Sequence, residues 1–220
     1  MMLSDITWME VALVVLAYVL LIGYHAALVS RVKKNPLKTS IGVNNQARME
    51  WVRNIMKNNR DILAVQTLRN LTMASSFLAS TAILVALGLM SYALTSESVQ
   101  NFSHALTRLG SHHPELVLFK IILLICIFLM AFFCYTLAIR YYNHAAFILN
   151  IPVSPENETQ VQKVGAVVNR GALQYTLGMR ASYLVIPFAM WLIGPEWLLA
   201  GTLFLLVVLY RIDYKHDLLG

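Results

Sequence analysis

The sequence predicts an all-α fold: a polytopic transmembrane helical bundle with three long spans, a short helical hairpin at the carboxyl end, and helices that overhang into the cytoplasm. Composition is the first observation behind this prediction, because 58% of the 220 residues are hydrophobic and only 13% are charged, which is rare in soluble domains. The second is that the apolar residues form blocks long enough to cross a hydrocarbon core about 30 Å thick. We therefore expect residues 1–220 to form a single membrane domain.

Three apolar blocks predict the long spans, at residues 8–28, 71–94 and 116–139. Charges are rare in these blocks, and Lys120 is the only charged residue in the third. The helices are expected to outrun the bilayer, since no Pro interrupts Asp61–Leu94 and a helix of that length would extend about 50 Å. The excess length predicts the cytoplasmic overhangs.

The last apolar region predicts the hairpin. Gly194-Pro195-Glu196 is a turn signal that leaves two short arms, at residues 181–193 and 197–210. Arms of this length cover about 20 Å at the helical rise, so they either span a thinned bilayer or follow a re-entrant path. A further overhanging helix is expected to start near Thr159 and run through Arg180 towards Gly194, although Gly165, Gly171, Gly178 and Pro187 weaken or bend it.

Basic residues fix the expected orientation. Of the 17 Lys and Arg residues, only Arg108 and Lys120 fall on the side opposite to the rest. The positive-inside rule then places the amino terminus outside and the carboxyl terminus in the cytoplasm of a bacterial inner (plasma) membrane. Because topology explains the basic charge, nucleic-acid binding is discounted. The expected partners are membrane lipids and further copies of the chain, in a homo-oligomer.

Residues 45–58 predict an amphipathic cytoplasmic helix. Met49, Val52, Ile55 and Met56 recur at helical spacing opposite the basic Arg48, Arg53 and Lys57. Such a segment either lies on anionic lipid or caps the overhanging helices, and the pattern favours neither use.

A polar stripe follows one face of the helix predicted across the second span. At 100° per residue, its members fall within roughly a third of the circumference. The stripe consists of Gln66, Arg69, Asn70, Met73, Ser76, Phe77 and Ser80. Small and polar residues on a membrane helix either line an aqueous path or let neighbouring helices approach and hydrogen-bond. The stripe from Met73 to Ser80 is therefore a candidate pore or packing surface.

Arginines near the expected membrane boundary outnumber carboxylates. A guanidinium at this depth requires a carboxylate, a carbonyl, water or an anion. One reading pairs Asp213 with Arg180 or Arg69 and lets the other arginines reach lipid phosphate; the other is a site for an anion or a phosphate headgroup. The candidate polar mouth consists of Gln66, Arg69, Asn70, Arg140, Asn143, Arg180 and Asp213.

His25 and His144 offer a different hypothesis, in which two imidazoles near the cytoplasmic boundary hold a haem iron or another metal. Their expected depths match poorly, so no cofactor and no metal site is assigned. Catalytic motifs are missing: the sequence contains no zinc-protease, nucleophile-elbow, Walker or dinucleotide-binding pattern. We therefore do not expect an enzyme.

Several motifs between about Ile22 and Asp213 are similar to a known family. They are Tyr24-His25, Ile41-Gly42-Val43-Asn44, Trp51 with Met56, the run ILAVQTLRN from Ile62 to Asn70, Ile139-Arg140 with Asn143, Gly178 with Arg180 and Tyr183, Pro187, and Gly194-Pro195. On these residues the chain resembles the uncharacterised membrane proteins grouped as domain-of-unknown-function family 599. The resemblance implies a multi-pass membrane protein and brings no activity with it.

Three functions fit these expectations. The favoured one is a homo-oligomeric channel or transporter for a small ion or an anionic solute, with a polar cytoplasmic mouth. The alternatives are a structural or lipid-binding membrane scaffold and a haem-binding or redox subunit.

Overall fold

The computed structural model describes residues 8–58, 61–94, 114–151 and 158–214, and within them the chain forms helices and no strand. The elements are α1 (Trp8–Lys34), a short 3-10 helix η1 (Pro36–Lys38), α2 (Ser40–Lys57), α3 (Asp61–Ala93), α5 (Pro114–Leu149), α6 (Glu158–Met190) and α7 (Pro195–Tyr214). The all-α class is confirmed.

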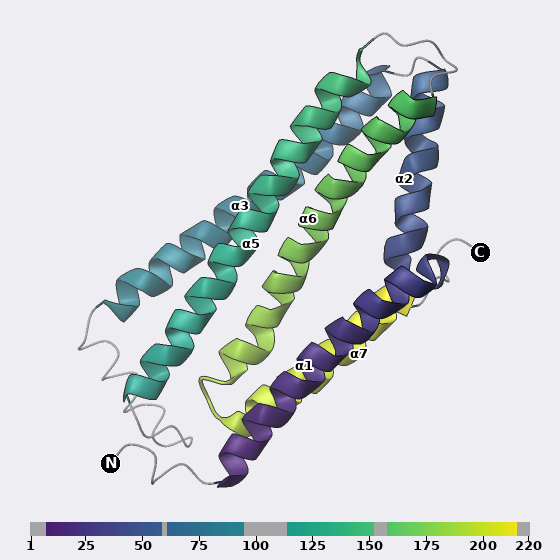
Figure 1. Ribbon diagram of the computed structural model, residues 1–220. Coiled ribbons are helices and arrows are strands. Elements are labelled where there is room, and N and C mark those ends of the chain that lie inside the picture. The colour runs from purple at the N-terminus through teal and green to yellow at the C-terminus, as the bar shows by residue number, and fades with distance from the viewer. Residues whose placement is uncertain (1–7, 59–60, 95–113, 152–157, 215–220) are drawn as a thin grey trace.

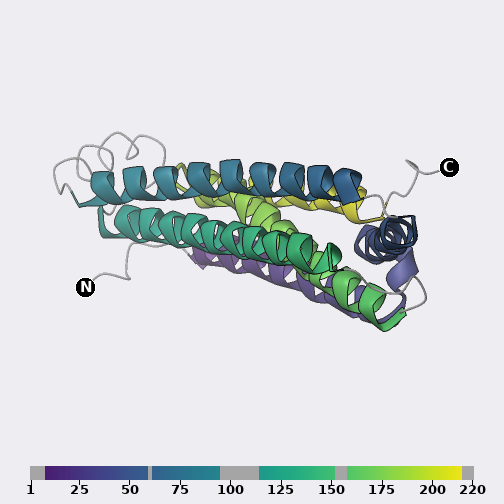
Figure 2. The same cartoon turned by 90° about the horizontal axis from the view of Figure 1, so that it is seen from above.

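Helix α6 runs through the middle of the molecule (Figure 1). Helices α3 and α5 lie on one side of it, and α1 and α7 lie side by side on the other. Helix α2 lies across one end of the bundle. It is seen almost end-on in Figure 2, where the long helices run from side to side across the picture. The arrangement leaves α6 in contact with α2, α5 and α7.

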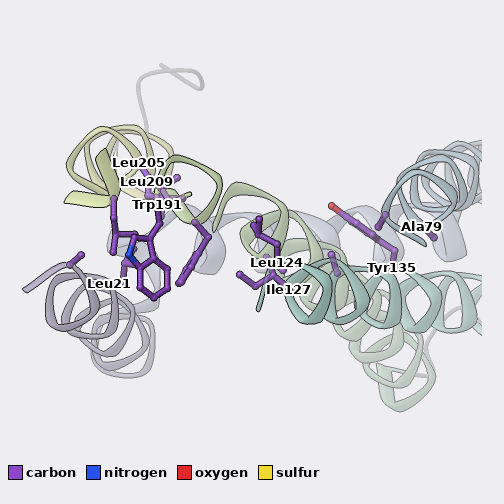
Figure 3. Close-up of a cluster of buried hydrophobic side chains, with 14 residues drawn as sticks. Leu21, Ala79, Leu124, Ile127, Tyr135, Trp191, Leu205 and Leu209 are labelled. Carbon is purple, nitrogen blue, oxygen red and sulfur yellow. The ribbon is translucent and has the colours of Figure 1, made fainter. Parts of the chain in front are cut away.

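A continuous apolar core joins the two sides. Figure 3 shows it as a row of side chains that starts with Leu21, Leu205 and Leu209 around Trp191, passes Leu124 and Ile127, and reaches Tyr135 and Ala79. Trp191 meets Tyr18 and Phe188 edge to face, at ring-centroid distances of 6.3 and 6.2 Å. This aromatic group holds α1 to the turn between α6 and α7, the end at which α6 and the α1–α7 pair converge.

Within the part of the chain that the structure describes, four helices are long and apolar enough to cross a membrane: α1, α3, α5 and α7. Helix α6 is not among them, because its first half is polar. It nevertheless starts at the end where α5 stops and joins α7 at the opposite end (Figure 1). A bilayer that α5 and α7 cross is therefore crossed by α6 as well, with its polar groups shielded by its neighbours.

The first arm of the expected hairpin is not a separate short helix. Residues 181–190 are the last part of α6, which is 33 residues long, and the turn comes at Trp191–Gly194; the second arm lies within α7. The glycines of α6 lower its intrinsic helix propensity, but they also let it pack closely against α5. A Cβ added at Gly178 would lie 2.7 Å from the ring of the buried Tyr135, so only glycine lets α5 and α6 approach this closely.

Helix α2 caps the overhanging helices, which decides between its two expected uses. Its Val52 and Ile55 are buried in a second apolar cluster with residues of α3, α5 and α6. An exposed ion pair of 2.6 Å between Arg53 and Glu158 adds a link to α6. The helix begins at Ser40, five residues before the expected start, because the side chain of Thr39 accepts a hydrogen bond from the amide of Gly42 as an N-cap.

Candidate functional site

A cavity of about 650 Å³ opens where α6 separates from α7, at the end of the bundle that α2 crosses. Helices α2, α6 and α7 supply most of its lining, and α1 contributes Val32. The polar lining residues are Ser40, Asn44, Asn45, Arg48, Asn169, Arg170, Tyr175, Thr176, Arg180, Tyr183 and Asp213. The cavity therefore exposes the polar groups of α6 that the surrounding helices leave uncovered.

An ion pair between Arg180 and Asp213 joins α6 to α7 at this cavity. Both side chains are buried, with exposed fractions of 11% and 2%. The second carboxylate oxygen of Asp213 accepts a hydrogen bond of 2.6 Å from the Tyr24 hydroxyl on α1. Three helices thus meet at one carboxylate, and of the two expected partners of Asp213 the structure selects Arg180.

One nitrogen of Arg180 has no acceptor. Its Nη1 atom is buried and makes no hydrogen bond to any part of the chain that the structure describes, while Nη2 donates to Asp213. A buried donor without a partner typically costs about 1–3 kcal/mol, and more when it is charged. Arg180 lines the cavity, but Nη1 is closed off from solvent, so an acceptor in the cavity reaches it only after the side chain turns.

Arg48 contributes a second positive charge from α2. Its Nε donates to Asn169 Oδ1 at 2.8 Å and its Nη2 to Asn45 Oδ1 at 2.5 Å. Both acceptors are neutral amides, so they hold the guanidinium in place without cancelling its charge. Burial lowers the pKa of Arg48 from its ordinary value, but an arginine remains charged at any physiological pH.

The charges of the lining residues sum to a positive site. Among the described residues, the lining contains three arginines, Arg48, Arg170 and Arg180, and one carboxylate, Asp213, which leaves a surplus of two positive charges. Arg170 lies exposed at the rim. A concave surface with this surplus attracts anions, and the partly buried position of two of the arginines weakens screening by salt.

The predicted polar mouth does not form a single site. Arg180 and Asp213 line the cavity just described, whereas Arg69 and Asn143 line a separate groove of about 440 Å³ between α3 and α5, together with Met73 and Ser76. Neither cavity includes the exposed residues Gln66, Asn70, Arg140, Phe77 and Ser80. The sequence places these groups at one depth, but α6 separates α3 from α7 (Figure 1).

The stripe on α3 faces away from the other helices. All seven of its residues are exposed in the single chain, and the side chain of Phe77, the one aromatic residue of the stripe, is 73% exposed. The stripe is therefore not a packing surface between helices of one chain within the described ranges. Lipid or another molecule must cover it in a membrane.

The two histidines lie on different sides of the bundle. His25 is on α1, where its Nδ1 is 2.8 Å from the carbonyl of Leu21, and His144 is exposed on α5. The carboxyl-terminal parts of α1 and α5 are on opposite sides of α6 in Figure 1. Across the residues that the structure describes, no group of three His, Cys, Asp or Glu side chains is close enough to hold a metal ion.

Sequence reasoning missed Tyr24, Arg48 and Asn169 as members of a site. The signal that points to the last of these is the polarity of α6 itself, in which Asn169, Arg170 and Arg180 interrupt a helix that has to cross the bilayer. Arg48 was assigned only to the polar face of an amphipathic helix, and nothing in its spacing indicates that it turns toward an asparagine 121 residues away.

The chain was compared with known proteins. The family described as "Protein of unknown function, DUF599" matches residues 12–218. No curated protein and no solved structure matches the chain.

Proposed function

We propose a function from the chain's own residues, because the chain belongs to the DUF599 family of proteins of unknown function and this family brings no activity with it. The proposed function is that of an integral membrane protein that binds an anionic solute in the α2–α6–α7 cavity and carries it as a channel or transporter. The observation that carries the proposal is the position of Arg180 on α6, beside the cavity and with one nitrogen that has no acceptor among the described residues. Ionisable groups at membrane depth are costly and typically mark substrate or ion paths.

The orientation of the cavity follows from the same reasoning. The ends of α1 and α7 next to the cavity, together with η1, are rich in basic residues, which supports a cytoplasmic location by the positive-inside rule. These residues are Arg31, Lys33, Lys34, Lys38 and Arg211. The cavity would then take its ligand from the cytoplasm or the cytoplasmic leaflet.

The proposal is tested by anion binding to the protein in lipid nanodiscs, with chloride, sulfate, inorganic phosphate and small carboxylates as probes. We expect Arg180→Gln to weaken the tightest-binding anion about 10- to 100-fold, since a charge-assisted hydrogen bond contributes about 1.5–3 kcal/mol. Arg170→Gln, at the exposed rim, should weaken it less and leave folding intact. Arg140→Gln is the matched control, because Arg140 is an exposed arginine that lines neither cavity.

Isothermal titration calorimetry measures the affinities, and anion flux into liposomes measures transport. Equal affinity in wild type, Arg170→Gln and Arg180→Gln, or equal losses in Arg140→Gln, would contradict the proposal. Arg170→Gln keeps the test decisive even where Arg180→Gln folds poorly.

We also propose that the exposed face of α3 is the contact between copies of the chain. Ser76 and Ser80 lie on this face, and Gly88 continues it; a Cβ added at Gly88 would meet no heavy atom within 4 Å. Small residues let membrane helices approach closely, and polar groups hydrogen-bond across such contacts. Lipid tails offer neither interaction, so a second copy suits this face better than lipid.

Ser80→Leu is therefore expected to shift the protein from oligomer to monomer, because the larger side chain keeps the two helices apart. Native mass spectrometry or mass photometry in nanodiscs measures the shift. Ala200→Leu, the same kind of change at an exposed position of α7, should leave the mass distribution unchanged. A monomeric wild-type protein would rule the contact out.

A further inference from the structure

We infer that the ligand of the α2–α6–α7 cavity is an amphiphile, with one oxyanionic headgroup and an apolar chain. This inference rests on the proposed function, since it assigns the class of anion that the same cavity takes. It goes further because it excludes a bare inorganic ion as the ligand that fills the site.

The size of the cavity is the first argument. Its volume of about 650 Å³ lies within the range of sites that enclose organic ligands, about 300–1,000 Å³. At about 30 Å³ for each water molecule, it would hold roughly 20 waters. An inorganic anion would replace only a few of them and leave most of the walls wet.

The chemistry of the walls is the second argument. Beside the arginines, the cavity presents a set of aliphatic and thioether side chains from all the helices around it. They are Val32, Ile41, Leu173, Met179, Leu209 and Ile212. Leu173 and Ile212 are each 49% exposed, so they keep apolar surface that a ligand could cover. A chain of methylene groups removes this surface from water, whereas a small polar solute does not.

Arg180 supplies the headgroup contact. One of its nitrogens donates to Asp213, and Nη1, which has no acceptor among the described residues, can donate to one oxygen of a carboxylate or phosphate once the side chain turns toward the cavity. Arg48 donates to the neutral amides of Asn45 and Asn169, which leave its charge uncancelled, and Arg170 adds a further positive charge to the lining. Carboxylate and phosphate share this chemistry, and an amphiphile that carries either one has two sources: a free single-chain compound or a membrane phospholipid.

The test is a chain-length series of alkyl phosphates, from inorganic phosphate through ethyl, butyl, hexyl and octyl phosphate. Binding is measured by calorimetry to the protein in zwitterionic nanodiscs, below the critical micelle concentrations, with empty nanodiscs subtracted. We expect the affinity to rise about threefold for each added methylene until the chain fills the cavity. Alcohols of the same lengths should bind at least tenfold more weakly, because they lack the charge that Arg180 and Arg170 attract.

Two variants separate the ends of the ligand. Leu173→Gln is expected to flatten the dependence on chain length while leaving inorganic phosphate binding unchanged, since Leu173 is half-exposed and contributes no charge to the cavity. Arg170→Gln is expected to lower the affinity of every phosphate by a similar factor. A competition arm then assigns the source: displacement of octyl phosphate by phosphatidylglycerol in the nanodisc supports a phospholipid, and persistence of octyl phosphate supports a free single-chain compound.

The outcomes distinguish this inference from the proposed function. An affinity that is the same from inorganic to octyl phosphate overturns the amphiphile and leaves anion binding in place. Alcohols that bind as well as the phosphates also overturn it, because the headgroup would then contribute nothing. Absence of binding by every phosphate and by the carboxylates overturns both.

Discussion

Replacing Asp213 with alanine should lower the free energy of unfolding by about 3–5 kcal/mol, because removal of one partner leaves a buried charge without compensation. The carboxylate is 2% exposed and is contacted by Arg180 from α6 and Tyr24 from α1. Without it, neither nitrogen of the Arg180 fork keeps its acceptor, since Nη1 already has none within the described chain. At about 2–4 °C per kcal/mol for a chain of this size, the melting temperature should fall by about 6 °C or more.

The controls for Asp213→Ala separate charge from volume. Asp213→Asn keeps the size of the side chain and an oxygen for the Tyr24 hydroxyl, and should be intermediate. The double variant Asp213→Leu with Arg180→Leu removes both charges and should recover much of the loss. Thermal unfolding in detergent measures all three. A melting temperature of Asp213→Ala within about 2 °C of wild type would show that the pair does not hold α6 to α7.

Gly42→Ala should destabilise the protein by about 3 kcal/mol, because it forces backbone against backbone. A Cβ at Gly42 would lie 2.0 Å from the carbonyl oxygen of Pro36 and 2.4 Å from its carbonyl carbon. These atoms belong to η1, whose carbonyl already accepts hydrogen bonds from Thr39, so no side chain can rotate away. Helix α2 has to shift, and since it lines the cavity, anion binding should weaken as well.

The matched control for Gly42→Ala is Gly23→Ala, the same change inside α1 with no heavy atom within 4 Å of the added carbon. Alanine is the better helix former by about 1 kcal/mol, so this variant should be neutral or slightly more stable in chemical denaturation. If Gly42→Ala behaves in the same way, the contact between η1 and α2 is looser than the structure indicates.

The sequence predicts most of the fold because the bilayer simplifies the problem. Apolar length alone locates α1, α3 and α5, and Gly194-Pro195 marks the turn before α7. The separate arm expected at residues 181–193 is instead mostly the end of α6. Intrinsic propensity is a poor guide here, since it treats Gly178 as a weak point in a helix. In the folded protein the same glycine lies against the ring of Tyr135, and packing on α5 stabilises the helix that propensity disfavours.

The site was harder to predict than the fold, since hydropathy gives depth in the membrane but not direction around the bundle. Arg180 and Asp213 were recognised as candidates, and they do meet. Arg69 was placed with them because its depth is similar, yet it lines a groove on the far side of α6. Only the order in which helices pack around α6 separates these arginines, and that order depends on contacts far apart in the sequence.

The aromatic group around Trp191 sets the width of a cavity that it does not touch. Trp191, Tyr18 and Phe188 fix the point from which α6 and the α1–α7 pair diverge. Asn169 lies 22 residues along α6 from that point, about 33 Å at the helical rise. A rotation of about 5° at the fulcrum would move Asn169 by roughly 3 Å over such an arm. Helix α6 is therefore a lever arm, and a small repacking of the aromatic side chains at its end becomes a displacement of several ångströms at the cavity.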